Sequence, residues 1–172
     1  MKIKTMALCG LFSALLAVCA WLAVPVGDTV ITLQTFGLFL CLWTLGGKHG
    51  AVSVFVYLLL GAVGLPVFSG FRGGFGALLG TTGGYLTGFL ACALVYWLLS
   101  ALLPRHPIVA MVAGLALCYL FGSIWYYNVY TAGGSATFGF IIIKCVLPFL
   151  LPDAVKLWLA WHVSKKLKRF VY

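Results

Sequence analysis

Apolar residues fill six long stretches of the chain, and short groups of charged, proline or glycine residues separate these stretches. A helix of about 20 apolar residues crosses the hydrocarbon core of a bilayer, which is about 30 Å thick. The pattern therefore predicts an all-α integral membrane protein, a six-transmembrane-helix bundle that forms a single domain over residues 1–172. The expected spans cover residues 5–25, 32–47, 50–65, 80–103, 108–130 and 138–163.

The second and third stretches are short for a bilayer crossing, and a glycine-rich segment follows them. Helices that stop inside a membrane protein are tolerated where they border a cavity. We therefore expect spans two and three to border a cavity, with a Gly-rich outer loop between spans three and four.

Basic residues gather at both ends of the chain and in alternate connections. Lys2 and Lys4 open the chain, and Lys48 and Arg105 lie between spans. Because cytoplasmic segments of membrane proteins are enriched in Lys and Arg, we expect both termini to be cytoplasmic. The end of the chain carries Lys165, Lys166, Lys168 and Arg169.

The amino-acid composition excludes several classes of function. Of the 172 residues, 64% are hydrophobic and 8% are charged, which leaves no room for a separate water-soluble domain. The net charge is +9, but the basic residues flank apolar spans, so we expect them to contact membrane lipid and not nucleic acid.

The chain lacks the motifs of common catalytic and cofactor sites. Its six cysteines stand singly in apolar runs, and no G-x-x-x-x-G-K-[ST] motif for nucleotide phosphates occurs. We expect no catalytic residue, no metal and no cofactor, and we predict that the chain is not an enzyme.

Three charged residues interrupt the last apolar stretch. A charge near the bilayer centre costs roughly 2.5–3.5 kcal/mol on insertion scales, so we expect a compensating partner and a function. Asp153 and Lys156 are three residues apart, which places them on one helix face within pairing distance. They form either a binding site or an ion pair that only fixes helix packing. Lys144 lies nearer the outer end, where a lysine can reach the headgroups, and Pro148 and Pro152 predict a kinked span.

Glycine makes up eight of the twenty residues from 70 to 89. Gly73 and Gly74 lie in loop-like sequence and predict a folded outer lid whose backbone can approach a ligand. The later glycines predict a seam for close helix packing, because small residues recur every four positions. The members of that seam are Gly76, Gly80, Gly84 and Gly88.

Three segments carry a resemblance to a known family. They read "ITLQTFGLFL", "GAVSVFVYLLLGAVGLPVFSGFRGGFGALLGTTGGYLTGF" and "LPFLLPDAVK", in that order. Together they resemble the BioY family, the biotin-specific S components of energy-coupling factor (ECF) transporters. The resemblance implies non-covalent biotin binding in a pocket open to the outside and release into the cytoplasm.

The resemblance also implies partners. S components of this kind assemble with a transmembrane T component and two cytoplasmic ATPases, and small residues on their first span face the T component. The matching candidates here are Gly10, Ser13, Ala14 and Ala17. Two alternatives remain open: an S component for another small vitamin, and a transporter that works without ECF partners.

The chemistry of biotin suggests roles for the charged residues. Asp153 can accept a hydrogen bond from a ureido N–H and Lys156 can donate to the ureido carbonyl, which leaves the buried protein charges neutral. This pose directs the carboxylate outward to Arg72, while the opposite pose, with Lys156 on the carboxylate, remains open. Positions that match the family's motifs add Gln34, Thr35, Phe68, Gly73, Gly74, Gly83, Gly84 and Tyr85 as candidates for the cavity wall.

Overall fold

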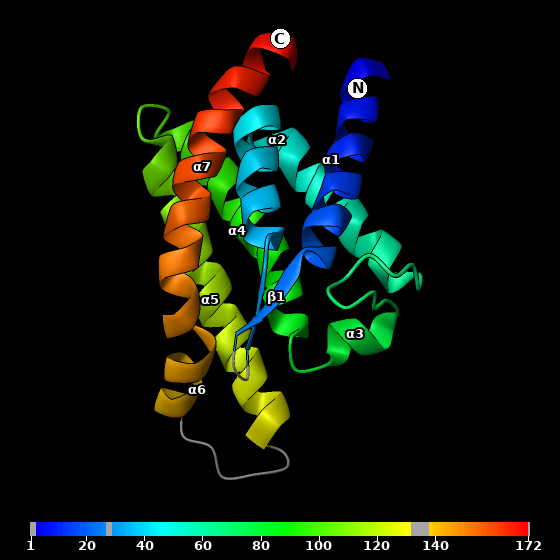
Figure 1. The fold of residues 1–172 in the computed structure, drawn as a ribbon. Helices are drawn as coiled ribbons and strands as arrows, with labels where there is room; N and C mark the ends of the chain where they lie inside the picture. The colour runs from blue at the N-terminus through cyan, green and yellow to red at the C-terminus, as the bar shows by residue number, and fades with distance from the viewer. Residues whose placement is uncertain (1–2, 27–28, 132–137, 172) are drawn as a thin grey trace.

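A computed structural model describes residues 3–26, 29–131 and 138–171, so Asp28 lies outside the described residues. Within these ranges the chain forms seven helices and one small sheet (Figure 1). The elements are α1 (Ile3–Trp21), β1 (Ala23–Val26), β2 (Thr29–Thr32), α2 (Gln34–Ala62), α3 (Phe75–Leu79), α4 (Gly83–Leu102), α5 (Pro107–Thr131), α6 (Phe138–Cys145) and α7 (Leu147–Val171).

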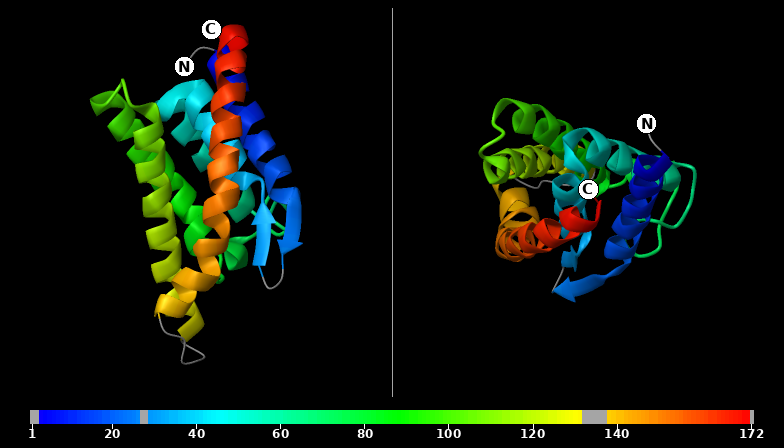
Figure 2. Two further views of the ribbon diagram at one scale, coloured as in Figure 1. Left: turned by 60° about the vertical axis from the view of Figure 1, so that its left-hand side comes forward. Right: turned by 90° about the horizontal axis from the view of Figure 1, so that it is seen from above.

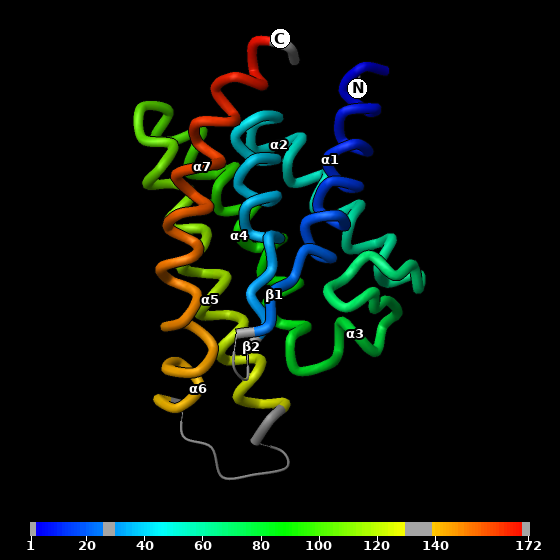
Figure 3. The backbone as a smooth tube through the Cα atoms, in the orientation of Figure 1, coloured from blue at the N-terminus to red at the C-terminus, as the bar shows by residue number. Residues whose placement is uncertain are grey.

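Helix α2 is bent back on itself and supplies two of the six passes. Gly46 has φ 79° and ψ 169°, a conformation that interrupts the helix and suits glycine. The two arms then lie side by side, and the Cys41 Sγ is 3.9 Å from the carbonyl oxygen of Gly50. The arms of α2, with α1, α4, α5 and the α6–α7 pair, account for six passes (Figure 3). The predicted six-helix bundle is confirmed.

Length and composition single out four of the described helices as able to cross a membrane. They are α1, α2, α4 and the Pro107–Val129 part of α5. The last pass is less regular: α6 ends at Cys145, α7 begins at Leu147, and Pro152 lies inside α7. The interruption predicted in this span is therefore present.

Both described ends of the chain lie at the same end of the bundle. The bend of α2 and the connection between α4 and α5 lie there too (Figures 1 and 2). This end carries Lys48, Arg105 and the basic end of α7. The arrangement agrees with the positive-inside rule, and the assignment of this end to the cytoplasm stays a prediction.

A β-hairpin replaces the expected end of the first span and the start of the second. The helix stops at Trp21, and β1 pairs antiparallel with β2 in the register Ala23 to Thr32. The prediction of helix to residue 25 was wrong because this segment is rich in β-branched residues and contains Pro25, which cannot donate a helical hydrogen bond. The sequence did contain a signal: Gly27 and Asp28 separate two valine-rich runs, as in two-residue hairpins.

Helix α1 packs against α2 through small side chains. Ser13 is 1% exposed and its hydroxyl is 2.8 Å from the carbonyl oxygen of Ser53, while Ala17 is 5% exposed. These two residues were expected to face a partner, and their burial inside the bundle removes them from its outer face. Gly10 and Ala14 are exposed on α1.

Two of the four seam glycines bring α4 against α5. A Cβ atom on Gly84 would collide with the Cβ atom of Trp125, and one on Gly88 would lie 2.9 Å from the Cys118 sulfur. Gly76 lies in α3, which ends at Leu79 and breaks the continuous helix that the spacing assumed. Gly80 meets α5 through its backbone, because its carbonyl oxygen accepts a hydrogen bond from the Trp125 indole N–H at 3.0 Å. The seam is thus shorter than predicted.

Substituting Gly84 should destabilise the bundle. Gly84→Ala inserts a methyl group into Trp125, and overpacking of this kind costs about 1–3 kcal/mol. Gly76→Ala is the matched control, because no atom lies within 4 Å of the added methyl group. Thermal unfolding of the purified protein in detergent should show a lower midpoint for Gly84→Ala only. Equal midpoints for the two variants would contradict the close packing of α4 on α5.

Candidate binding cavity

The centre of the candidate site is a buried ion pair on α7. The Lys156 Nζ lies 2.7 Å from the Asp153 Oδ1, and the two residues are 6% and 1% exposed. The spacing of three residues turns both side chains to one face of the helix. The predicted pairing of these two residues is confirmed.

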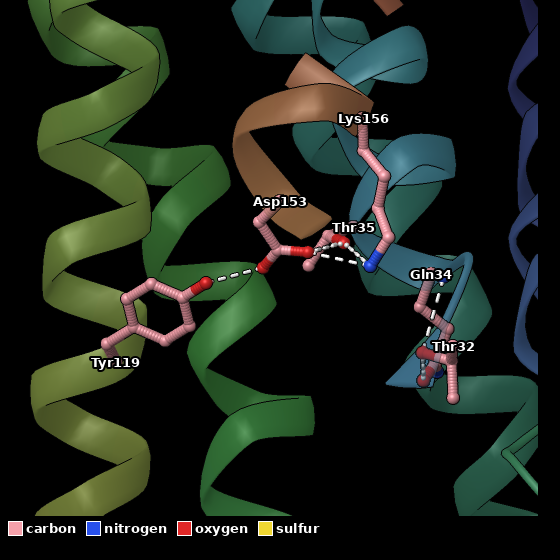
Figure 4. A network of polar contacts seen from close by, with 6 residues as sticks. All are labelled: Thr32, Gln34, Thr35, Tyr119, Asp153 and Lys156. Carbon is pink, nitrogen blue, oxygen red and sulfur yellow. Dashed lines mark hydrogen bonds and ion pairs between the residues drawn. The ribbon is translucent and has the colours of Figure 1, made fainter. Parts of the chain in front are cut away.

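Two hydroxyl groups from other helices complete the coordination of the carboxylate. Thr35, at the start of α2, donates to the Asp153 Oδ1 at 2.7 Å, and Tyr119 from α5 donates to the Asp153 Oδ2 at 2.5 Å. The Lys156 Nζ also donates to the Thr35 hydroxyl oxygen at 3.1 Å. Figure 4 shows Tyr119 approaching Asp153 on the side opposite Thr35 and Lys156. The charged pair thus ties α2, α5 and α7 together.

The hydrogen-bonding capacity of the pair is not exhausted by these contacts. A carboxylate has about four lone-pair positions and an ammonium group has three donors. Asp153 accepts three hydrogen bonds and Lys156 donates two within the described residues. One acceptor position, on the Asp153 Oδ2, and one donor of Lys156 therefore remain for a neutral ligand that presents both an N–H and a carbonyl.

The pair lies in the wall of a cavity of about 370 Å³. This volume falls in the range of cavities that hold small organic molecules. Apolar side chains such as Phe89, Leu115 and Phe149 form much of the wall, and the strand residues Val30 and Thr32 close part of it. The cavity therefore combines an apolar body with a few polar contacts.

Seven of the residues proposed from the sequence are brought together in this wall. Gln34 lies where α2 begins inside the protein, 6% exposed, so the short second span does border a cavity as expected. Its amide nitrogen donates to the Tyr57 hydroxyl at 2.8 Å. Its amide oxygen accepts from the Thr32 hydroxyl at 3.0 Å, as Figure 4 shows. The seven are Gln34, Thr35, Phe68, Arg72, Tyr85, Asp153 and Lys156.

The four glycines proposed for the wall are not among the lining residues. A side chain on Gly73 would collide with the carbonyl oxygen of Leu65, and one on Gly83 with that of Leu78. Gly74 has φ 87° and donates its N–H to Gly61, while Gly84 packs on Trp125. These glycines allow the chain to approach itself closely.

The segment between α2 and α3 is held against the bundle by aromatic contacts. Phe68 is 2% exposed and meets the Tyr57 ring edge-on, with ring centroids 5.6 Å apart. Trp21 stacks on Phe71 and donates its indole N–H to the carbonyl oxygen of Pro66 at 2.8 Å. The outer loop predicted as a lid is therefore anchored at both α1 and α2 in this conformation.

Several polar residues of the wall were missed or given another role, among them Tyr119, Thr32 and Lys144. Tyr119 has no distinguishing sequence context, since it lies in an apolar span rich in aromatic residues. Thr32 belongs to the unpredicted hairpin. Lys144, expected to reach the headgroups, lines the same cavity. Helical spacing gave no signal for this lysine, because nine residues at 3.6 residues per turn place it on the opposite side of a continuous helix from Asp153.

A helical bundle with a partly polar cavity of this size among its helices defines a multi-pass membrane protein with a site for a small organic solute. Comparison with known proteins identifies the family: the chain matches the BioY family over residues 1–172 and belongs to it. Members of this family are transporter components, so the protein is not an enzyme.

Curated relatives span nearly the full chain. "Biotin transporter BioY" of Thermotoga maritima is 39% identical over 163 residues, which cover 93% of each chain. "Probable biotin transporter BioY" of Pyrococcus horikoshii is 36% identical over 98% of each chain. Among solved structures, the S component for biotin from an ECF-type ABC transporter superposes with a TM-score of 0.86 at 25% identity, covering 98% of this chain and 92% of that chain.

Removing one member of the ion pair should cost more stability than removing both. Asp153→Asn and Lys156→Met each leave one buried group without its partner, a loss of about 3–5 kcal/mol. The double variant removes both charges, so its loss should be well below the sum of the single losses. Lys166→Met, at an exposed position of α7, is the control. Additive losses in detergent unfolding would show that the two side chains do not interact.

Proposed function

We propose that this chain is the membrane-embedded biotin-binding S component of an ECF-type transporter and takes up biotin across the bacterial cytoplasmic membrane. The observation that carries the proposal is the hydrogen-bonded Asp153–Lys156 pair in the wall of a small-molecule cavity. Family membership and the names of the full-length relatives supply the identity of the solute. The chain binds biotin non-covalently and transports it chemically unchanged.

The free positions on the pair suit the ureido group of biotin. A ureido N–H takes the remaining acceptor position of Asp153, and the ureido carbonyl takes the remaining N–H of Lys156. The ureido group is neutral, so the buried cluster stays neutral on balance when biotin binds. The apolar ring then meets Phe89, Leu115 and Phe149, which lie in the same wall.

Energy coupling requires partners that supply ATP hydrolysis. We propose a transmembrane T component and two cytoplasmic ATPases, as the ECF-type structural neighbour suggests. Gly10 and Ala14 are the two candidates of the first span that remain exposed, and they lie one helical turn apart on α1. The alternative, transport without these partners, makes no use of this surface.

Substitution of the charged pair should remove tight biotin retention. Asp153→Asn and Lys156→Ala each delete a charge-assisted hydrogen bond to the ureido group, worth about 1.5–3 kcal/mol, or about tenfold to a hundredfold in affinity. The measurement is retention of labelled biotin by the folded fraction after size exclusion, with Lys166→Ala as control. Unchanged retention in both variants would refute the site. Failure of unlabelled biotin to compete, where another small vitamin does, would instead favour the alternative vitamin.

Bulky residues on the exposed face of α1 should block assembly and spare binding. Gly10→Leu and Ala14→Leu add side chains that project from α1 and prevent the close approach of another helix. Co-purification with a T component should therefore fall strongly, while biotin retention stays at the original level. Ala101→Leu, an exposed position at the end of α4, is the matched control. Normal assembly of both variants would show that α1 is not the contact surface. Undiminished biotin uptake by cells that express this chain alone would favour the partner-free alternative.

A further inference from the structure

The segment between α2 and α3 contains an unusual backbone conformation. Phe71 has φ 57°, and in the part of the chain that the structure describes it is the only residue other than glycine with a positive φ. This region is disfavoured for an aromatic residue, so the conformation persists only where surrounding contacts hold it. Conformations of this kind gather at ligand clamps and switch segments. Phe71 therefore requires a contact that holds it, and its backbone suggests a function.

Trp21, the last residue of α1, supplies that contact. Its ring stacks on the Phe71 ring, with centroids 5.2 Å apart and planes inclined by 24°. Its indole N–H donates to the carbonyl oxygen of Pro66 at 2.8 Å. One side chain thus holds the segment both at its beginning and at its turn. Phe71 and Trp21 are 65% and 39% exposed, so this stacked pair lies on the outside of the bundle and adds little to its core.

The residues on either side of this turn belong to the cavity wall. The Phe68 backbone N–H donates to the carbonyl oxygen of Arg72 at 2.9 Å, and both residues line the cavity. The Phe68 ring is buried against Gly61, where an added Cβ atom would collide with it. Neither Phe71 nor Trp21 is among the described residues that line the cavity. The backbone at Phe71 thus determines where two wall residues lie, without contact between its own side chain and the cavity.

We propose that Trp21 and Phe71 are positioning residues, which hold Phe68 and Arg72 in the cavity wall and thereby slow the dissociation of biotin. This inference rests on the proposed function, because it takes biotin as the ligand. With the two rings stacked, Phe71 keeps its positive φ and the turn stays closed beside the cavity. Without the stack, the preference of Phe71 for a negative φ opens the turn and displaces both wall residues. The pair therefore acts on the ligand through the backbone.

The test measures how fast the purified full-length protein, loaded with labelled biotin, releases it into an excess of unlabelled biotin. Trp21→Leu and Phe71→Gly should each release biotin about threefold to tenfold faster, the range expected for loss of an aromatic pair. Phe71→Tyr keeps the stacked ring and should release biotin at nearly the original rate. Phe75→Ala removes another exposed phenylalanine, from α3, and is the matched control.

Two further measurements distinguish positioning from a merely structural role. Phe71→Gly should leave the midpoint of thermal unfolding nearly unchanged, because the relief of the positive φ offsets the greater freedom of the unfolded chain. The double variant of Trp21→Leu and Phe71→Gly should release biotin no faster than the faster single variant, since either change alone breaks the stack.

The possible outcomes separate this inference from the proposed function. Unchanged release rates in Phe71→Gly and Trp21→Leu would refute the positioning role while biotin binding stands. Equally fast release from Phe75→Ala, or rates that multiply in the double variant, would also overturn it. If Trp21→Leu does not fold, the comparison of Phe71→Gly with Phe71→Tyr decides alone. Wild-type protein that retains no labelled biotin would refute the proposed function and this inference with it.

Discussion

The buried pair of Asp153 and Lys156 is the constraint on which the rest of the site depends. Two charges inside a membrane protein are tolerated only when each meets its partner and further hydrogen-bonding groups. Here the further groups come from α2 and α5, because Thr35 and Tyr119 both donate to the carboxylate. Because the two charges need these partners, α2, α5 and α7 are held together around one cavity. The same requirement explains why α2 begins inside the protein, where its first turn can reach Asp153.

Glycines and aromatic residues set the distances at which these helices meet. Gly84 and Gly88 let α4 lie against α5, and Gly73 lets the outer segment fold onto the carbonyl of Leu65. Phe68 fills the space next to Tyr57, whose hydroxyl joins Gln34 to the carbonyl of Val67 at 3.2 Å. The close backbone approach that glycine permits thus serves packing, while larger side chains shape the cavity. Binding and folding share elements here, but they use different residues of those elements.

The cavity is polar at two separate places, and this separation follows from the geometry of the last pass. The break between α6 and α7 and the proline in α7 leave the helical spacing of the lining residues intact, from Cys145 through Phe149 to Asp153. A neutral pair at one place suits neutral polar groups, and the basic side chains of Arg72 and Lys144 lie elsewhere in the wall. Such a distribution favours an amphipathic solute and disfavours simple ions, since the apolar wall between the two places offers ions no contact.

The sequence by itself determined the class of protein, the six passes and the charged pair. Apolar length, the cost of buried charge and helical spacing are local properties that act in the same way in any fold. Only the tertiary structure decided which residues meet across helices. Tyr119 reaches Asp153, Lys144 faces the cavity, and Gly83 and Gly84 turn away from it, because each depends on how α4, α5 and the last pass rotate about their axes. The apolar pattern also failed to predict the β-hairpin. A valine-rich strand and the end of an apolar helix have the same hydrophobicity, and they differ only in the hydrogen-bond partners that the fold provides.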